Sequence, residues 1–236
     1  TSNLMKLDLP EVVFIDLDGT LVDSVPDLTH ATNHMLSSLG LAKASENDVR
    51  SWVGNGIPRL VERALTGDME QKADVGLFEK ALPLFLDYYQ QFPCEKSQVY
   101  PDVFKGLNWL KDKQIKLACV TNKDETFTLP LLEKLGLKDY FDLVVCGDTT
   151  PHKKPHPAPL LYGVDYFRIT PEKALMIGDS VNDVKAANAA GFAIICVSYG
   201  YNHGQPISAA APDTVIDTFA ELESLFLERS NETVRI

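Results

Sequence analysis

The sequence predicts an α/β fold with a parallel sheet core and a helical cap domain inserted into it. Five short apolar runs recur along the chain, and each is followed by a turn and a helix-like pattern. The runs are continuous rather than alternating in polarity, which is typical of strands buried on both faces of a parallel sheet. Between the first two runs lies a long interval that carries helical patterns only. These features indicate a sheet interrupted once by a separate helical unit.

The core elements follow in chain order. The expected strands are 12–16, 115–121, 143–148, 174–179 and 193–198. Helical patterns begin at Asp102, end before Gly136, and cover Val181–Ala190, where Gly191 suits a left-handed C-terminal cap. Alternating strands and helices predict right-handed crossovers and a three-layer, Rossmann-like core with helices on both faces of the sheet.

The long interval predicts the cap. Its helical patterns cover 27–39 before Gly40, 57–65 before Gly67, and 69–91. We therefore assign 22–93 to a helical cap domain and 1–21 with 94–236 to the α/β core domain. Pro93 and the stretch 98–101 are expected to form the linker that returns the chain to the sheet.

Composition excludes several function classes. The 236 residues include 22 Lys+Arg and 33 Asp+Glu, which gives a formal charge of −11, so a nucleic-acid partner is disfavoured. No apolar run approaches the ~20 residues that span a bilayer, and the N-terminal stretch lacks the pattern of a secretory signal. The four cysteines form no C-x-x-C pair and are expected to be buried thiols. We expect a cytoplasmic protein with no membrane partner. The sequence leaves its oligomeric state open.

Polar side chains gather where the expected strands end. In an open parallel sheet, ligands bind at the carboxyl ends of the strands. The residues found there are Asp16, Asp18, Thr121, Lys154, Asp179 and Asp183. Crowded carboxylates are costly to ionise together without a cation, and oxygen-rich sites suit Mg²⁺, which accepts phosphate oxygens. A Lys and a Thr hydroxyl supply donors to the same oxygens, and an Asp can itself be a nucleophile.

Four motifs carry a resemblance. They are Asp16-Leu17-Asp18-Gly19-Thr20, Thr121-Asn122, Lys154-Pro155, and Gly178-Asp179-Ser180-Val181-Asn182-Asp183. In this order they resemble the four motifs of the haloacid dehalogenase superfamily, in its phosphatase branch. The resemblance covers nearly the whole chain, and the inserted helices resemble the cap that this superfamily places between its first and second motifs.

The resemblance implies a role for each core residue. Asp16 is expected to attack phosphorus and to bind Mg²⁺. Asp18 is expected to be the general acid and base, and to bind the metal through its backbone carbonyl. Thr121 and Lys154 are expected to bind the phosphoryl group, Lys154 being preferred over the adjacent Lys153. The expected phosphate-binding set also includes Gly19, Thr20 and Asn122.

Two metal-side roles stay open at this point. Asp179 is expected to be a metal ligand. Asp183 is either a second metal ligand or the residue that orients Lys154. Ser180 and Asn182 fit helix caps as well as ligand contacts.

The cap carries the question of specificity. Trp52-Val53-Gly54-Asn55-Gly56 and the following Leu60-Val61-Glu62-Arg63-Ala64-Leu65 resemble the phosphoglycolate phosphatase group. Arg59 and Arg63 lie about one helical turn apart, so one of them could bind the substrate's carboxylate, or both could lie on a solvated helix face. The resemblance therefore implies Mg²⁺-dependent hydrolysis of a small phosphorylated metabolite, with 2-phosphoglycolate as the leading substrate.

Rival functions remain. Within the enzyme class, the alternatives are a phosphatase for another small metabolite or phosphosugar, and a β-phosphoglucomutase-like mutase. A signalling receiver also places carboxylates, a Thr and a Lys at strand ends, but it is near half this length and has no cap. A non-catalytic binding protein is disfavoured because every expected catalytic residue is present.

With the net charge at −11, we expect the affinity for an anionic substrate to depend on Mg²⁺, Lys154 and backbone amides rather than on overall charge.

Overall fold

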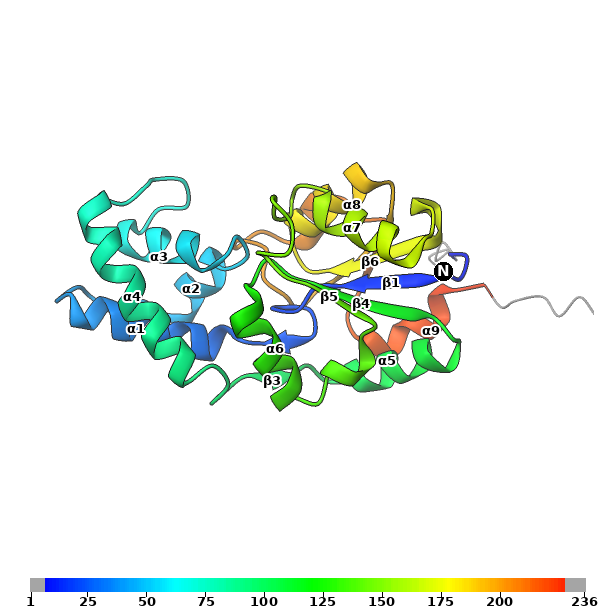
Figure 1. Ribbon diagram of the computed structural model, residues 1–236, viewed down its shortest axis with the longest axis horizontal. Helices are drawn as coiled ribbons and strands as arrows, with labels where there is room; N and C mark the ends of the chain where they lie inside the picture. Colours follow the sequence, from blue (N-terminus) through cyan, green and yellow to red (C-terminus); the bar gives the residue numbers. More distant parts are fainter. Residues whose placement is uncertain (1–6, 228–236) are drawn as a thin grey trace, which may run out of the picture.

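The computed structural model describes residues 7–227 and has a six-stranded parallel sheet at its centre (Figure 1). The order across the sheet is β5-β4-β1-β6-β7-β8. The strands are β1 (Val12–Ile15), β4 (Lys116–Val120), β5 (Leu143–Val145), β6 (Ala174–Gly178), β7 (Ala193–Val197) and β8 (Thr214–Ile216). The chain thus leaves β1 toward β4 and β5 on one side and later adds β6 to β8 on the other, which makes β1 the point where the strand order reverses.

All five expected strands are confirmed, and each is shorter than its apolar run. The carboxyl-end residues of the runs, such as Asp16 and Thr121, lie beyond the last ladder residue. The sequence missed β8, because it has only three residues and its middle residue, Val215, is exposed. So short a run carries no pattern that separates it from a loop.

Side chains of each strand alternate between two buried layers. Val13 and Ile15 of β1 pack on one face, and Val12 and Phe14 pack on the other. The first face is covered by α5 (Val103–Asp112), α6 (Glu125–Lys134) and α9 (Leu222–Leu225), and the second by α7 (Ala158–Phe167) and α8 (Val181–Ala190) (Figure 1). The expected three-layer α/β core is confirmed.

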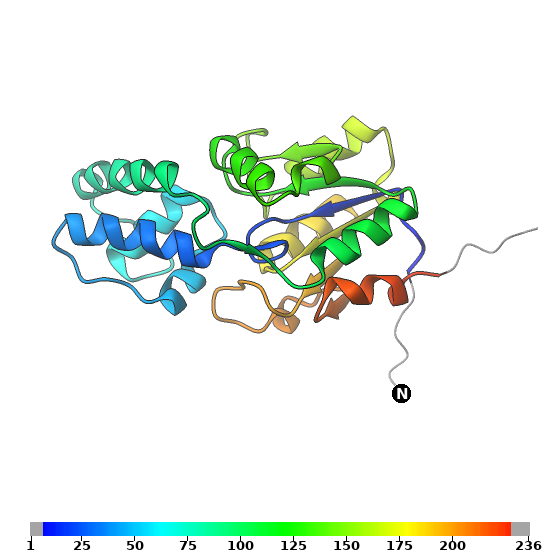
Figure 2. The same ribbon diagram turned by 90° about the horizontal axis from the view of Figure 1, so that it is seen from below.

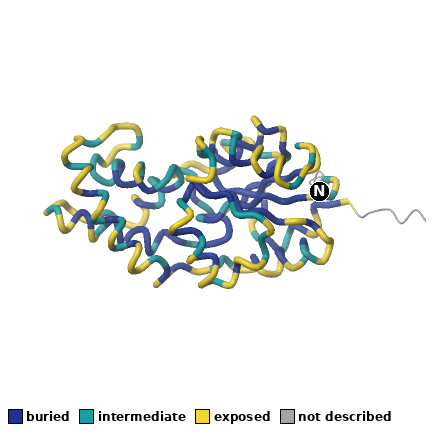
Figure 3. Tube along the Cα trace, viewed as in Figure 1, coloured by how far each residue is buried: buried dark blue, intermediate teal, exposed yellow. Residues whose placement is uncertain are grey.

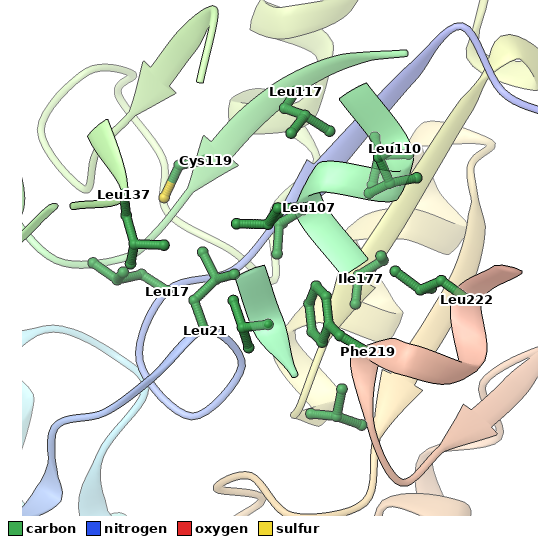
Figure 4. Packing of buried hydrophobic residues seen from close by; sticks show 14 of the residues in the cluster. Leu17, Leu21, Leu107, Leu110, Leu117, Cys119, Leu137, Ile177, Phe219 and Leu222 are labelled. Atoms are coloured by element: carbon green, nitrogen blue, oxygen red, sulfur yellow. The ribbon is translucent and has the colours of Figure 1, made fainter. Parts of the chain in front are cut away.

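The buried cluster on the Val13 and Ile15 face extends into the loop that follows β1. Leu17 and Leu21 are fully buried and point into the cluster formed with Leu107 and Phe219 (Figure 4). Leu17 lies between Asp16 and Asp18, so its burial fixes the backbone from which both carboxylates extend. Burying a Leu side chain contributes roughly 2 kcal/mol, which makes this an effective anchor.

Four of the helices between β1 and β4 form a separate unit beyond the end of the sheet (Figure 2). They are α1 (Val25–Ser38), α2 (Glu46–Trp52), α3 (Ile57–Thr66) and α4 (Val75–Gln91). The sequence missed α2, because only Val49 of its seven residues is buried and no apolar face marks it. The expected start of the last helix at 69 is six residues too early, since Asp74 caps its N-terminus by accepting from the amide of Leu77. The domain boundaries at 22 and 93 stay a prediction.

Two short connections join these helices to the sheet. β2 (Val22–Asp23) pairs antiparallel with β3 (Gln98–Val99), a ribbon that the sequence did not predict because each strand has only two residues. Asp27 lies beside it in α1 and is buried. Its carboxylate accepts hydrogen bonds from the amides of Glu95, Lys96 and Ser97 and from the Ser97 hydroxyl, at 2.6–3.3 Å.

Asp27 is therefore expected to hold the returning linker. Changing Asp27→Ala leaves the buried amide of Ser97 and the partly buried amides of Glu95 and Lys96 without their acceptor, and should lower the free energy of unfolding by about 3 kcal/mol. Urea unfolding measures this change. The matched control is Asp87→Ala on the exposed face of α4, which should cost less than about 0.5 kcal/mol. Equal losses in the two variants would contradict the role of Asp27.

Burial follows the layers (Figure 3). Strands β1 and β6 at the centre of the sheet are buried throughout, while the edge strands β5 and β8 and the outer faces of the helices are partly exposed. Within residues 7–227, no helix has the length and apolarity needed to cross a membrane. Cys94, Cys119, Cys146 and Cys196 are buried free thiols, as expected from the sequence.

Candidate active site

The site is built around the loop that follows β1. The amides of Thr20, Leu21 and Val22 all donate to the carbonyl oxygen of Leu17, which closes a tight turn. Gly19 has φ +85°, and a Cβ there would lie 2.1 Å from Oδ2 of Asp179. Only glycine fits this conformation and this approach. The loop therefore brings the residues after β1 against those after β6.

Three carboxylates meet at this point. Asp16 follows β1, while Asp179 and Asp183 follow β6 and begin α8. Each offers one oxygen, and the three oxygens lie within 4.8 Å of one another. Gly178 permits the approach, since a Cβ there would meet the Asp183 side chain at 2.3 Å. The side chain of Asp18 is outside this cluster, so its expected metal contact, through the backbone carbonyl, stays a prediction.

Lys154 brings one positive charge to the cluster. Its Nζ lies 2.7 Å from Oδ1 of Asp183 and 3.2 Å from Oδ1 of Asp16, and it donates to the carbonyl oxygen of Val120 at 2.8 Å. Asp183 is fully buried, and its other oxygen accepts from the amides of Asp179 and Ser180. Asp183 thus does what one of the two sequence alternatives proposed, by fixing Lys154, and it also remains one of the three clustered carboxylates.

The titration of the cluster shows its excess of negative charge. Burial, followed by the neighbouring charge of Asp183, raises the pKa of Asp16 from its ordinary 3.8 to about 8, although Lys154 partly opposes this. Burial and the charge of Asp16 raise the pKa of Asp179 as well. Burial acts in the same direction on Asp183, but the adjacent Lys154 ammonium outweighs it and lowers the pKa of that carboxyl. One ammonium does not balance three carboxylates, so this all-oxygen set fits a hard divalent cation such as Mg²⁺.

This charge excess predicts a pH-dependent stability. Between about pH 4 and 8, folded Asp16 holds a proton that the unfolded chain has released. The free energy of unfolding of the metal-free protein should therefore fall as the pH rises through that window. Urea unfolding with chelator at about pH 5 and pH 8 measures the difference, and Asp16→Asn, which cannot titrate, should show a smaller one. An equal fall in both proteins would contradict the assignment to Asp16.

Asp18 lies on the other side of the loop and has its own partners. Its Oδ1 accepts hydrogen bonds from the Ser24 hydroxyl and, at 2.8 Å, from Nζ of Lys123. Lys123 is buried, and its Nζ also donates to the hydroxyl of Tyr89 at 2.7 Å. Neither Lys123 nor Tyr89 was predicted from the sequence as a site residue. Lys123 directly follows the Thr121-Asn122 motif, and this adjacency was the available signal.

The remaining expected phosphate-binding residues are placed around Asp16. Thr121 and Asn122 line the same cavity as Asp16, Asp18 and Lys154. The side-chain amide nitrogen of Asn122, Nδ2, donates to the backbone carbonyl oxygens of Gly54 and Lys154, each at 2.8 Å. Thr20 instead donates to Oδ1 of Asp179 at 3.1 Å, so its side chain orients a member of the carboxylate cluster. None of these contacts is itself a phosphate contact, and that role stays a prediction.

The cap covers the cavity with an apolar wall. Leu28, Val53, Ile57 and Leu60 line it from the cap side, together with Gly54 and Gly56. Several hydrogen bonds hold the cap against the core. Nη2 of Arg50 donates to the carbonyl oxygen of Tyr199, Nδ1 of His203 lies 2.8 Å from the carbonyl oxygen of Ser51, and Gly54 accepts from Asn122.

The structure does not place Arg59 or Arg63 in this cavity. Arg63 is buried and donates to the carbonyl oxygens of Trp52 and Met69 and to Oδ1 of Asn55. Arg59 donates to the carbonyl oxygens of Met69 and Gln71. Arg59 keeps 22% of its side chain exposed and lies 3.7 Å from Glu62, which is nearer to the solvated-face alternative, whereas the buried Arg63 matches neither alternative in this structure. Arg63 thus ties the loop 52–56 at the cavity to Met69, whereas Arg59 binds only the stretch that contains Met69 and Gln71.

Tyr201 is a further residue that sequence reasoning missed. Its amide donates to Oδ2 of Asp179 at 2.7 Å, and its hydroxyl contacts Asp23 and the amide of Ser24. Burial raises the pKa of this phenol, so it stays protonated. Tyr201 thus joins the loop after β7 both to the carboxylate cluster and to the end of β2, a link that no local sequence pattern marks.

Comparisons with known proteins agree with this geometry. Residues 12–197 match the model of the haloacid dehalogenase-like hydrolase family. A phosphoglycolate phosphatase of Nitrosococcus oceani is 54% identical over 93% of this chain and 97% of its own, and one of Nitrosospira multiformis is 45% identical over 96% and 100%. A crystal structure described as a predicted phosphoglycolate phosphatase from Haemophilus somnus superposes with a TM-score of 0.85 at 38% identity, covering 91% of this chain and 96% of that one.

Proposed function

Because the chain belongs to the haloacid dehalogenase-like hydrolase family, we propose that it is a Mg²⁺-dependent phosphatase that hydrolyses 2-phosphoglycolate through an aspartyl-phosphate on Asp16. The observation that carries this proposal is the position of Asp16. Its carboxylate lies in the cavity, 3.2 Å from the Lys154 ammonium, with Asp18 two residues away on the same loop. A nucleophile, a cation for the phosphoryl oxygens and a separate proton carrier are thus adjacent.

In the first step, a carboxylate oxygen of Asp16 attacks phosphorus while the bond from phosphorus to the leaving oxygen breaks. Asp18 gives its proton to that oxygen, which leaves as an alcohol. Lys154 stabilises the charge on the transferring group, as its contact with Asp16 favours. Phosphoryl transfer depends mainly on such positioning and charge neutralisation.

In the second step, a water oxygen attacks the phosphorus of the aspartyl-phosphate, and Asp18 accepts the proton of that water. The bond to Asp16 breaks, which frees the carboxylate and inorganic phosphate. The balance is one phosphomonoester and one water giving one alcohol and one phosphate. The cap wall over the cavity favours this sequence, because it excludes bulk water during the first step.

The carboxylate cluster is the expected metal-binding site. Asp16, Asp179 and Asp183 would hold Mg²⁺, which when bound supplies positive charge to the phosphoryl oxygens. Thr20 and the amide of Tyr201 orient Asp179 for this task, while the contact with Lys154 orients Asp183.

A turnover screen tests the proposal. Phosphate release from a panel of phosphorylated metabolites should give the highest kcat/KM for 2-phosphoglycolate, should stop with chelator, and should return with Mg²⁺. Activity that is indifferent to chelator would overturn the metal assignment. Isomerisation of β-glucose 1-phosphate without phosphate release would establish the mutase alternative instead.

A further inference from the structure

The cavity contains a second buried cation, Lys123, on the side away from Lys154. Its ammonium group carries three N–H bonds. Two are used, one on Oδ1 of Asp18 and one on the Tyr89 hydroxyl, at 2.8 and 2.7 Å. The ion pair with the Asp18 carboxylate holds this ammonium in the cavity. Among the described residues, its third N–H has no partner, and Lys123 lines the cavity.

The position of Lys123 beside Asp18 determines which part of a bound substrate its ammonium group can contact. The leaving oxygen of a substrate must come within hydrogen-bond distance of Asp18 to receive its proton. Lys123 is bound to that same carboxylate. A substituent one carbon beyond the leaving oxygen is therefore close enough to contact Nζ of Lys123. In 2-phosphoglycolate, the group at that position is a carboxylate.

The other walls offer a carboxylate neutral groups, among them Ser180 and Asn182, and one cation that is already paired. The cap contributes the apolar side chains of Leu28, Val53, Ile57 and Leu60. Lys154 is held between Asp16 and Asp183, on the phosphoryl side. Arg59 and Arg63 are bound to cap backbone carbonyls. Of the lysines and arginines described here, Lys123 is the one beside the proton-donating carboxylate in the cavity.

We propose that Lys123 is the specificity-determining residue, which selects substrates whose leaving group carries a carboxylate one carbon from the phosphate ester oxygen. One ammonium group then does two things: it binds that carboxylate and it holds Asp18. The inference rests on the proposed function, because it assumes that Asp18 faces the leaving oxygen. Tyr89 belongs to α4 of the cap, so the cap must be seated for Lys123 to be held in place.

A pair of substrates of matched size separates the two activities of Lys123. These are 2-phosphoglycolate and 2-hydroxyethyl phosphate, which replaces the carboxylate by a neutral CH₂OH group. Lys123→Met should lower kcat/KM for 2-phosphoglycolate by about 100-fold, mainly through a higher KM, because a charge-assisted hydrogen bond is lost. The loss for 2-hydroxyethyl phosphate should be at least ~10-fold smaller. Equal losses would show that Lys123 only positions Asp18, and would overturn the proposal.

Further variants keep the test decisive. Lys123→Gln retains a donor for Asp18 without the charge, so it should lose the preference for 2-phosphoglycolate even if Lys123→Met does not fold. Lys123→Arg should restore part of the preference, and Lys185→Met, an exposed lysine on α8, should leave it unchanged. A Lys123→Gln enzyme with the wild-type preference would contradict the proposal. If the wild type hydrolyses 2-hydroxyethyl phosphate but not 2-phosphoglycolate, the proposed substrate itself is wrong.

Discussion

Changing Asp16→Asn should reduce kcat by roughly 10⁴-fold or more, the scale on which removal of a catalytic nucleophile acts. The amide lacks the anionic oxygen that attacks phosphorus, and it removes one of the three clustered carboxylates. Steady-state release of phosphate from 2-phosphoglycolate with saturating Mg²⁺ measures the change.

Asp148→Asn is the matched control. Asp148 also follows a strand of the sheet, but it is exposed and accepts a hydrogen bond from the amide of Glu125 rather than joining the cluster. Its replacement should leave kcat within about twofold of wild type, since exposed substitutions away from the reacting atoms have small effects. Turnover by Asp16→Asn near the wild-type rate would remove Asp16 as the nucleophile.

Changing Lys154→Met should impair both stability and catalysis. Lys154 is 2% exposed and Asp183 is 0% exposed, so its loss leaves a buried carboxylate without a partner. Breaking a buried ion pair in this way costs about 3–5 kcal/mol. Loss of a cation aimed at the phosphoryl group should also reduce kcat by roughly 10²- to 10³-fold.

Urea unfolding with chelator and steady-state kinetics with Mg²⁺ separate the two effects. The control is Lys153→Met, at the adjacent lysine that the sequence could confuse with Lys154. Lys153 is partly exposed and has no ion pair among the described residues, so its loss should cost less than about 1 kcal/mol. A Lys153 variant as damaged as the Lys154 variant would contradict the assignment of Lys154.

The α/β core and the polar residues at the carboxyl ends of its strands could be predicted because both follow from local sequence patterns. Continuous apolar runs marked five strands, and parallel strands bring their carboxyl ends to one edge, so Asp16, Asp179 and Lys154 had to meet there. The helix Val181–Ala190 was readable from its Gly191 cap, which has φ +81° in the structure. Elements that lack a clear apolar run or a C-terminal glycine cap were missed. They are the seven-residue helix α2, the strand β8, and the two-residue strands β2 and β3.

The side of the site that faces the leaving group could not be predicted in the same way. Tyr89 and Lys123 are 34 residues apart, and Tyr201 and Asp179 are 22 apart, so their contacts depend on how loops pack. Arg63 shows the opposite failure. Its charge and spacing fitted a substrate contact. In the structure, its guanidinium group instead donates hydrogen bonds to the backbone carbonyl oxygens of Trp52 and Met69 in the cap.

Direct detection of the aspartyl-phosphate tests the central claim that Asp16 accepts the phosphoryl group. Asp18→Asn incubated with Mg²⁺ and acetyl phosphate should accumulate it, because the acetate leaving group needs no proton whereas hydrolysis of the intermediate needs the missing base. After an acid quench, borohydride reduction and peptide mass spectrometry, homoserine is expected at position 16, and none in the Asp16→Asn, Asp18→Asn double variant. A phosphoryl group trapped on any other residue, with position 16 unmodified, would contradict it.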